Sequence, residues 1–159
     1  MSAPILIRRA KERDAREVLG LLAQVLEIHA AIRPDVFVSG TTKYKEEELK
    51  AIFLDDSMPV FVAEEDKSVV GYVFCKMKKN PEGGNLVPFS SVYIDDLCVD
   101  EKARGRGIGE ALFRYALDYA RKAGCYEVTL NVWEGNDGAR RFYQKMGMLP
   151  KSTTMELIL

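Results

Sequence analysis

Histidine and cysteine are scarce in this sequence. The chain has one histidine, His29, and three cysteines, none of which belongs to a C-x-x-C pair. A structural zinc site normally takes four such ligands, so the sequence predicts no metal centre. Cys75, Cys98 and Cys125 all lie in or beside apolar segments, where we expect small buried side chains in a reducing compartment.

The sequence also lacks an excess of one charge and a long apolar run. Its formal net charge is -1, which provides neither the basic field of a nucleic-acid-binding protein nor an acidic tail. No apolar run approaches the roughly 20 residues of a membrane span. The N-terminal segment MSAPILIRRAKERD is not a secretory signal, because its apolar patch precedes its charges. We therefore expect a cytoplasmic protein without nucleic-acid or membrane partners.

The amino-acid composition is typical of a globular protein. The 159 residues suit a single domain spanning 1–159, and 47% hydrophobic with 30% charged residues can build a sizeable core. No internal repeat, low-complexity tract or domain linker is visible. This composition narrows the class of protein but not its function.

Hydrophobic periodicity predicts an α/β fold. Asp14 followed by Glu17 is typical of a helix capping box. Hairpin-connected strands followed by a strand–helix–strand unit predict a mixed sheet with helices on both faces. The expected helices cover 14–30, 44–54, the segment from the glycine loop to about 123, and ARRFYQKM. The expected strands are PILIRRA, PVFVAEE, SVVGYVFCKM, VYIDDLCV, YEVTLNVW and TTMELIL.

Arginine and glycine alternate in RGRGIG (104–109), between a predicted strand and a predicted helix. Glycine permits close approaches, and the first turn of a helix has unpaired N–H groups and a partial positive charge. Such a loop can hold a phosphate by backbone donors, with the two arginines adding charge-assisted contacts. The dinucleotide fingerprint G-x-G-x-x-G fails, because Glu110 stands at the last glycine, and no G-x-x-x-x-G-K-[ST] occurs.

Two motifs carry a family resemblance. YIDDLCVDEKARGRGIGEALFRYALDYARKAGC resembles the signature strand, pyrophosphate loop and helix of the GCN5-related N-acetyltransferase (GNAT) family. NDGARRFYQKMGM resembles the family pattern N-x-x-A-x-x-F-Y-x-x-x-G-F, with Met148 at the final position. The resemblance spans nearly the whole chain. It implies a GNAT-type, mostly antiparallel sheet and acetyl transfer from acetyl-CoA, without a metal, to a primary amine.

The resemblance also implies where acetyl-CoA binds. Backbone N–H groups of the loop would hold the pyrophosphate, and a strand edge would pair with the pantetheine arm much as it would with a peptide. The expected coenzyme contacts are Leu97, Cys98, Val99, Arg104, Gly105, Arg106, Gly107, Ile108, Gly109, Glu110, Asn136, Ala139 and Tyr143.

Three side chains are the expected catalytic groups. Tyr143 matches the family tyrosine near the coenzyme sulfur and would protonate the departing thiolate; a core position is the alternative. Asp95 matches a position at which many relatives carry a glutamate base, and its shorter side chain favours a bridging water. Asp96 is the other candidate base, or both acids organise the strand. Alternation places them on opposite faces unless a bulge intervenes.

The acceptor amine is less defined. The backbone N–H of Leu97 is the candidate donor to the acetyl carbonyl. His29, at the end of the first helix, either contacts the acceptor or is structural. Asp95 and Asp96 would attract a cationic amine such as a polyamine; an amino acid, an amine-bearing antibiotic and a protein amine also fit. The alternative function is a non-catalytic acyl-CoA-binding regulatory module, and a homodimer is compatible with either.

Overall fold

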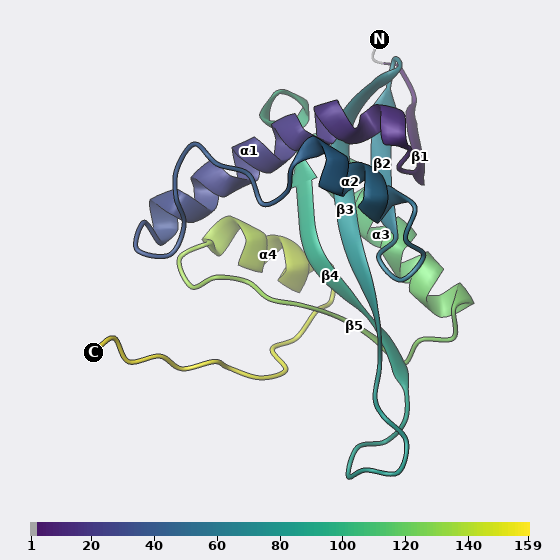
Figure 1. Cartoon of the computed structure of the whole chain (residues 1–159), viewed down its shortest axis with the longest axis vertical. Coiled ribbons are helices and arrows are strands. Elements are labelled where there is room, and N and C mark those ends of the chain that lie inside the picture. The colour runs from purple at the N-terminus through teal and green to yellow at the C-terminus, as the bar shows by residue number, and fades with distance from the viewer. Residues whose placement is uncertain (1–2) are drawn as a thin grey trace.

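The computed structural model describes residues 3–159, in which strands and helices are interspersed (Figure 1). The strands are β1 (Ile5–Arg9), β2 (Val60–Glu65), β3 (Ser68–Lys79), β4 (Ser90–Val99) and β5 (Glu127–Leu130). The helices are α1 (Ala15–Ile32), α2 (Glu46–Phe53), α3 (Ile108–Lys122) and α4 (Asp137–Lys145), with 3₁₀ turns η1 (Glu12–Asp14) and η2 (Glu101–Ala103). Within residues 3–159, no helix is both long and apolar enough to cross a membrane.

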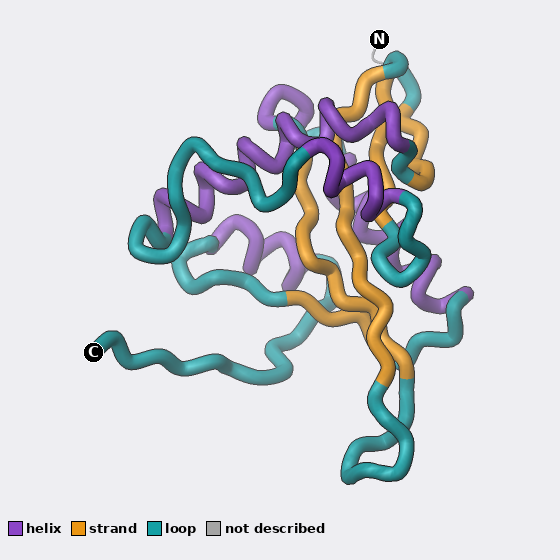
Figure 2. The backbone as a smooth tube through the Cα atoms, viewed as in Figure 1, coloured by secondary structure: helices purple, strands orange, loops and turns teal. Residues whose placement is uncertain are grey.

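The five strands form one mixed sheet in the order β1-β2-β3-β4-β5. Neighbours from β1 to β4 are antiparallel, whereas β5 runs parallel to β4. The loop that joins the long strands β3 and β4 projects away from the rest of the molecule (Figure 2). The predicted mixed, mostly antiparallel sheet is therefore confirmed.

Helices cover both faces of this sheet. In Figure 1, α1 and α2 lie in front of the sheet and α3 lies behind it. Val18, Leu21 and Leu22 recur at helical spacing on α1 and are buried against the front face. Leu112 and Phe113 of α3 belong to the second core cluster, on the opposite face. Burying side chains of this size stabilises the fold by about 1.5–3 kcal/mol each.

A β-bulge interrupts β4 between its two aspartates. Phe74 and Cys75 of β3 pair with Asp96 and Ile94, so Asp95 is an extra residue on β4 without a cross-strand partner. The extra residue shifts the alternation, and Asp96 shares the face of its partner Phe74, which packs in the core beneath α1 and α2. Asp95 and Asp96 were expected on opposite faces unless a bulge intervened. The bulge is present, so simple alternation does not apply to these two residues.

The predicted final strand is wrong. Residues 150–159, which include TTMELIL, have no regular secondary structure and extend as a single chain away from the sheet (Figures 1 and 2). Met155, Leu157 and Ile158 are exposed. A strand is stable only beside another strand, and no strand in residues 3–159 pairs with this segment. Alternating hydrophobicity could not reveal the missing partner.

The start of α1 is capped differently from the prediction. Asp14 occupies the N-cap position, but its side chain makes no capping hydrogen bond to α1. It accepts instead from the backbone N–H of Lys11 at 2.8 Å, within η1. Glu17 accepts from the N–H of Val69 at 2.9 Å and so ties α1 to β3. The predicted capping box is therefore wrong, because both carboxylates have partners outside the helix.

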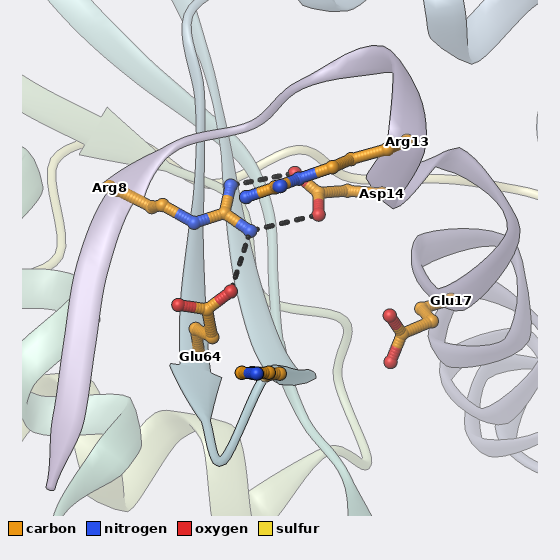
Figure 3. Close-up of a pocket in the computed structure, with 6 residues that line it drawn as sticks. Arg8, Arg13, Asp14, Glu17 and Glu64 are labelled. Atoms are coloured by element: carbon orange, nitrogen blue, oxygen red, sulfur yellow. Dashed lines mark hydrogen bonds and ion pairs between the residues drawn. The ribbon is translucent and has the colours of Figure 1, made fainter.

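Arg8, Asp14 and Glu64 form a partly buried ion cluster, called here the Arg8 cluster, in which Asp14 is the buried member (Figure 3). The Arg8 guanidinium donates to both oxygens of Asp14, at 2.8 and 2.9 Å, and to Glu64 at 3.1 Å. Burial raises the pKa of Asp14, but hydrogen bonds from Arg8 and from the Lys11 N–H outweigh it, and the pKa falls below 3.8. The cluster joins β1, β2 and the start of α1 beside a cavity of about 480 Å³.

Candidate active site

The sheet opens between β4 and β5. β5 pairs with β4 only from Ser91 to Ile94, whereas β4 continues to Val99. Within residues 3–159, the segment from Leu97 to Val99 pairs with β3 on one side and with no strand on the other. Its backbone groups on the β5 side can therefore hydrogen-bond to an extended, amide-bearing ligand.

The glycine loop connects this strand edge to α3. Gly105 and Gly107 both have φ of +78°, the left-handed region that favours glycine, and Gly107 is the N-cap of α3. A Cβ at either position would meet no atom within 4 Å, so backbone conformation rather than space requires glycine there. The helix starts at Ile108, and the N–H groups of its first turn are available to an anion.

The two arginines of the loop have partners within the protein. Arg106 forms an ion pair with Glu65 at the end of β2. Arg104 donates from its Nε to the carbonyl of Val99 at 3.1 Å and borders a cavity of about 430 Å³ between α1 and the loop. Arg106 is therefore occupied by Glu65, whereas the terminal nitrogens of Arg104 and the backbone N–H groups of the loop can donate to a ligand.

Gly109 brings three elements together beneath the loop. A Cβ on Gly109 would lie 3.6 Å from Val99, 3.7 Å from Phe142 and 3.8 Å from Leu97. This glycine of α3 therefore faces the partnerless end of β4 and the side of α4 that carries Phe142. The strand edge, the start of α3 and α4, which come from the two sequence motifs, therefore pack against one another.

Asn136 and Ala139 interact with each other at the start of α4. The Asn136 side chain caps this helix by accepting from the N–H of Ala139 at 3.2 Å. The structure thus gives Asn136 a local structural role that the motif alone did not reveal. Coenzyme contact by these two residues stays a prediction.

Tyr143 lies on the half-buried side of α4. Its ring packs 5.8 Å from that of Phe113 and 5.0 Å from that of Phe142, measured between centroids. Burial raises the pKa of the phenol, and the negative charge of Asp96 raises it further. Tyr143 is therefore protonated at neutral pH, as a general acid must be, and Asp96 is close enough to influence it electrostatically.

The two aspartates have different surroundings. Asp95, whose side chain is 11% exposed, binds Lys43 Nζ at 2.6 Å and Lys76 Nζ at 3.6 Å. Asp96 accepts a hydrogen bond from the hydroxyl of Tyr72 at 2.6 Å. Burial raises the pKa of Asp96 to about 6, against the lowering effect of this hydrogen bond. We refer to Lys43, Lys76 and Asp95 as the Asp95 cluster.

His29 lies near the end of α1, as predicted, in an aromatic group. Its ring is 5.2 Å from that of Phe37, which packs edge-on against Trp133 at 5.5 Å. Burial lowers the pKa of His29, so the imidazole is neutral at physiological pH. The structure does not bring His29 into contact with the Asp95 cluster through any hydrogen bond or ion pair of the described residues. Its role in acceptor binding stays a prediction.

Sequence reasoning missed Lys43, Lys76 and Tyr72. Lys43 follows α1 in a loop and lies 52 residues before its partner Asp95. Tyr72 reaches Asp96 across the β3–β4 pair, whose register the bulge displaces. No local pattern marks these residues. A β3–β4 alignment that allowed for a bulge at the double aspartate could have suggested the two β3 side chains.

Comparison with known proteins places this geometry in a family. Residues 22–148 match the acetyltransferase (GNAT) family, and the chain belongs to that family. Among residues 3–159, no group of three or more His, Cys, Asp or Glu side chains is arranged to hold a metal ion. The mixed, mostly antiparallel sheet with helices on both faces is the fold that the family resemblance predicted.

Several relatives are similar over most of the chain. A probable glucosamine 6-phosphate N-acetyltransferase 2 of Oryza sativa subsp. japonica is 28% identical, covering 95% of this chain and 86% of the relative. The thialysine N-epsilon-acetyltransferase of Bos taurus is 27% identical, covering 90% and 83%. A mutant of the BH1408 protein of Bacillus halodurans has a solved structure with a TM-score of 0.91 at 33% identity, covering 97% and 99%.

Other matches are partial. The aligned region spans 38% of the length of glucosamine 6-phosphate N-acetyltransferase 1 of Oryza sativa subsp. japonica, at 40% identity. It spans 39% of an uncharacterized N-acetyltransferase of Methanocaldococcus jannaschii, at 37% identity. All four of these curated relatives are named as N-acetyltransferases; two names give glucosamine 6-phosphate as the acceptor, one gives thialysine and one gives none.

Proposed function

We propose that this protein transfers the acetyl group of acetyl-CoA to a primary amine. The observation that carries the proposal is the run from Leu97 to Ile108, in which a strand edge without a partner leads through a glycine loop to a helix N-terminus. This order offers backbone partners first to an amide-bearing arm and then to a diphosphate, as acetyl-CoA requires. Relatives named as N-acetyltransferases support the same reaction class.

In this proposal the coenzyme lies along the opening between β4 and β5. The backbone of Leu97, Cys98 and Val99 pairs with the pantetheine arm, and the N–H groups from Arg104 to Glu110 surround the pyrophosphate. Arg106 contributes its charge at a distance, because Glu65 already binds it. The side of α4 that carries Tyr143 faces the thioester.

We assign the base to Asp96 rather than to Asp95. A carboxyl group with a pKa of about 6 is ionised at neutral pH and still accepts a proton readily. Asp95 is instead occupied by two ammonium groups. Tyr143 is the proposed acid, and the N–H of Leu97 is the proposed donor to the acetyl carbonyl.

The proposed acetyl transfer begins with removal of a proton from the acceptor. Asp96 removes one proton from the acceptor ammonium and releases it to solvent. The free amine then attacks the acetyl carbon, so that a C–N bond forms and the C–S bond breaks. Tyr143 gives its phenol proton to the departing sulfur and regains one from the amine nitrogen. The products are the N-acetylated acceptor and the free thiol of coenzyme A.

Ligand binding and thiol release test the proposal directly. A ligand that binds only the native state raises its apparent stability, so acetyl-CoA should raise the melting temperature and NAD should not. Free thiol should then appear when a suitable amine is added. Stabilisation by NAD alone would contradict the proposal.

Tyr143→Phe separates binding from chemistry. Loss of a general acid typically lowers turnover by about 10²-fold or more, whereas acetyl-CoA should stabilise the variant as it does the wild type. Tyr126→Phe is a matched control, because Tyr126 is 74% exposed. Unchanged turnover in Tyr143→Phe would contradict the acid assignment. Acetyl-CoA binding without thiol release for any amine would support the non-catalytic binding module instead.

A further inference from the structure

Two lysine side chains share the carboxylate of Asp95, and a third lysine lies on the same hairpin. Asp95 shares its carboxylate between Lys43, at 2.6 Å, and Lys76, at 3.6 Å. A third ammonium, that of Lys78, lies 4.3 Å from the centroid of the Tyr93 ring. Asp96, which is ionised at neutral pH, accepts a hydrogen bond from the neutral Tyr72 hydroxyl rather than from an ammonium group. Two ammonium groups therefore share the single carboxylate of Asp95, and the third lies against an aromatic ring.

These groups lie on one face of the β3–β4 hairpin. Side chains two residues apart on a strand share a face, so Lys76 and Lys78 share that of Phe74. Tyr93 stands opposite Lys76 in the register, and the bulge turns Asp96 to the same face. Lys43 reaches this face from the chain between α1 and α2, where the neighbouring Tyr44 ring stacks 6.1 Å from that of Phe74.

The lysines are accessible enough to exchange partners. The side chain of Lys43 is 52% exposed and that of Lys76 is 36% exposed, whereas that of Asp95 is 11% exposed. Burial favours the neutral form of Lys43, but the hydrogen bond and charge of Asp95 outweigh it and leave the pKa of Lys43 raised. Lys43 is therefore a cation that already occupies an aspartate next to the proposed base.

From this arrangement we infer that the acceptor is a primary amine that also carries an anionic group, a carboxylate or a phosphate. The inference rests on the proposed acetyl transfer and specifies its substrate class. The ammonium of the acceptor would replace Lys43 at Asp95, next to Asp96. The anionic group would bind Lys43 and Lys76, so that both lysines keep a negative partner when they release Asp95.

A polycationic acceptor fits this surface less well. Its first ammonium would have to displace Lys43 without offering the lysine a new partner, and its second would approach Lys76 and Lys78. Like charges brought together at a partly buried site repel each other, and displaced ammonium groups would have to be rehydrated. The double aspartate alone suggested a polyamine; its lysine neighbours reverse that preference.

Paired acceptors that differ only in the anion test the inference. Lysine is compared with 1,5-diaminopentane, which lacks only the carboxylate, and glucosamine 6-phosphate is compared with glucosamine. Spermidine is the polycation, and kcat/KM is measured by thiol release. We expect the anionic member to exceed its partner by at least 10-fold in one pair and to exceed spermidine. The pair that responds identifies a carboxylate or a phosphate.

Lys43→Met and Lys76→Met show whether the lysines cause the preference. Each should reduce the ratio within the responding pair at least 5-fold, mainly through KM, and should improve the use of spermidine. Lys122→Met, at an exposed position in the last turn of α3, is the matched control and should leave the ratio unchanged. Circular dichroism and melting curves establish that the variants fold.

Failure of the inference and failure of the proposed function give different results. If acetyl-CoA binds and spermidine or an uncharged amine is acetylated as well as the anionic acceptors or better, the inference is overturned and the acetyl transfer stands. An anion preference that survives in both lysine variants would also overturn it. Absence of acetyl-CoA binding and of thiol release with every amine would overturn both.

Discussion

The Arg8 cluster and the aspartates of β4 each shield a carboxylate from solvent, but they shift its pKa in opposite directions. Asp14 receives two hydrogen bonds from one guanidinium and one from a backbone N–H, and its pKa falls below 3.8. Asp96 receives a hydrogen bond from the neutral hydroxyl of Tyr72, and burial raises its pKa to about 6. Rigid cationic pairing stabilises the charged acid in the first case, and burial leaves the acid ready to take a proton in the second.

The two pKa directions imply opposite effects of pH on stability. A lowered pKa in the folded state stabilises the fold above 3.8, and this contribution is lost as the pH falls through the folded value. A raised pKa has the reverse sign: between 3.8 and about 6 the folded state binds more protons, so deprotonation of Asp96 costs stability as the pH rises. One acid therefore serves the fold at neutral pH, and the other lowers its stability in a position suited to catalysis.

Asp14→Asn should have the largest effect on stability. It keeps the volume of the side chain but leaves the Arg8 guanidinium with Glu64 as its only carboxylate within the cluster. Removing one partner of a buried ion pair costs about 3 kcal/mol of unfolding free energy, which urea denaturation at pH 7 measures. Turnover per folded molecule should not change. The difference from the wild type should shrink as the pH falls from 3.8 toward the lowered pKa of Asp14 in the folded state, because the unfolded chain takes up the proton first.

Asp56→Asn is the control for Asp14→Asn. Asp56 pairs with Arg9, but its side chain is 96% exposed, so its loss should cost no more than about 0.5 kcal/mol. Equal losses in the two variants would show that burial does not distinguish the Arg8 cluster from a surface pair.

Asp96→Asn should show the opposite pattern. The amide oxygen can still accept from the Tyr72 hydroxyl, and the cost of a buried charge disappears, so stability at pH 7 should be equal or higher. Turnover should fall by about 10²-fold if the carboxylate acts as a base. In the wild type kcat should rise with pH through about 6, and this limb should be absent from the variant.

Asp95→Asn completes the test of Asp96→Asn. Because we place Asp95 in acceptor binding, its substitution should raise KM and leave the pH limb of kcat in place. If the rise of kcat with pH were lost in Asp95→Asn and kept in Asp96→Asn, Asp95 would be the base and Asp96 the residue that binds the acceptor.

The sequence predicted the features that depend on short-range geometry. RGRGIG and the helix after it were recognisable because left-handed glycines and a helix start lie within a few residues, and the structure has them at Gly105, Gly107 and Ile108. The structure brings Tyr143 and Asp96, one from each motif, within electrostatic reach of each other. These features determine where the coenzyme is expected to bind.

The remaining features depend on partners distant in the sequence. Lys43 meets Asp95 only because the chain after α1 crosses the hairpin, and the pairing of Tyr72 with Asp96 depends on the bulge. The apolar alternation of TTMELIL suggested a strand although no neighbouring strand pairs with it. Asp14 had the spacing of a helix cap, but Arg8 provides a stronger partner than a backbone N–H.

Gly105→Ala and Gly83→Ala form a matched pair. Both should cost the same backbone strain energy, but only Gly105 lies in the loop proposed to bind the coenzyme. Gly83, in the β3–β4 loop, has φ of +79°, nearly that of Gly105, and a Cβ at either position would meet nothing within 4 Å. Each alanine should therefore cost about 1 kcal/mol of unfolding free energy. Only Gly105→Ala should weaken acetyl-CoA binding, measured by calorimetry, because only that loop is proposed to hold the pyrophosphate. Equal affinities in both variants would contradict the proposed loop contact.

Glu156→Gln tests how far the stabilisation provided by the Arg8 cluster depends on burial. Arg33 also binds two carboxylates, Asp35 at 2.8 Å and Glu156 at 2.6 Å, yet Glu156 is 58% exposed and lies in the extended C-terminal segment. Solvent screens such pairs, so the loss of unfolding free energy in urea denaturation should be much smaller than that of Asp14→Asn. If Glu156→Gln lost as much unfolding free energy as Asp14→Asn, an arginine that binds two carboxylates would stabilise the fold equally well at an exposed position. The number of carboxylates bound by the arginine, rather than burial, would then determine the stabilisation. The C-terminal segment would also be anchored to the fold through Arg33.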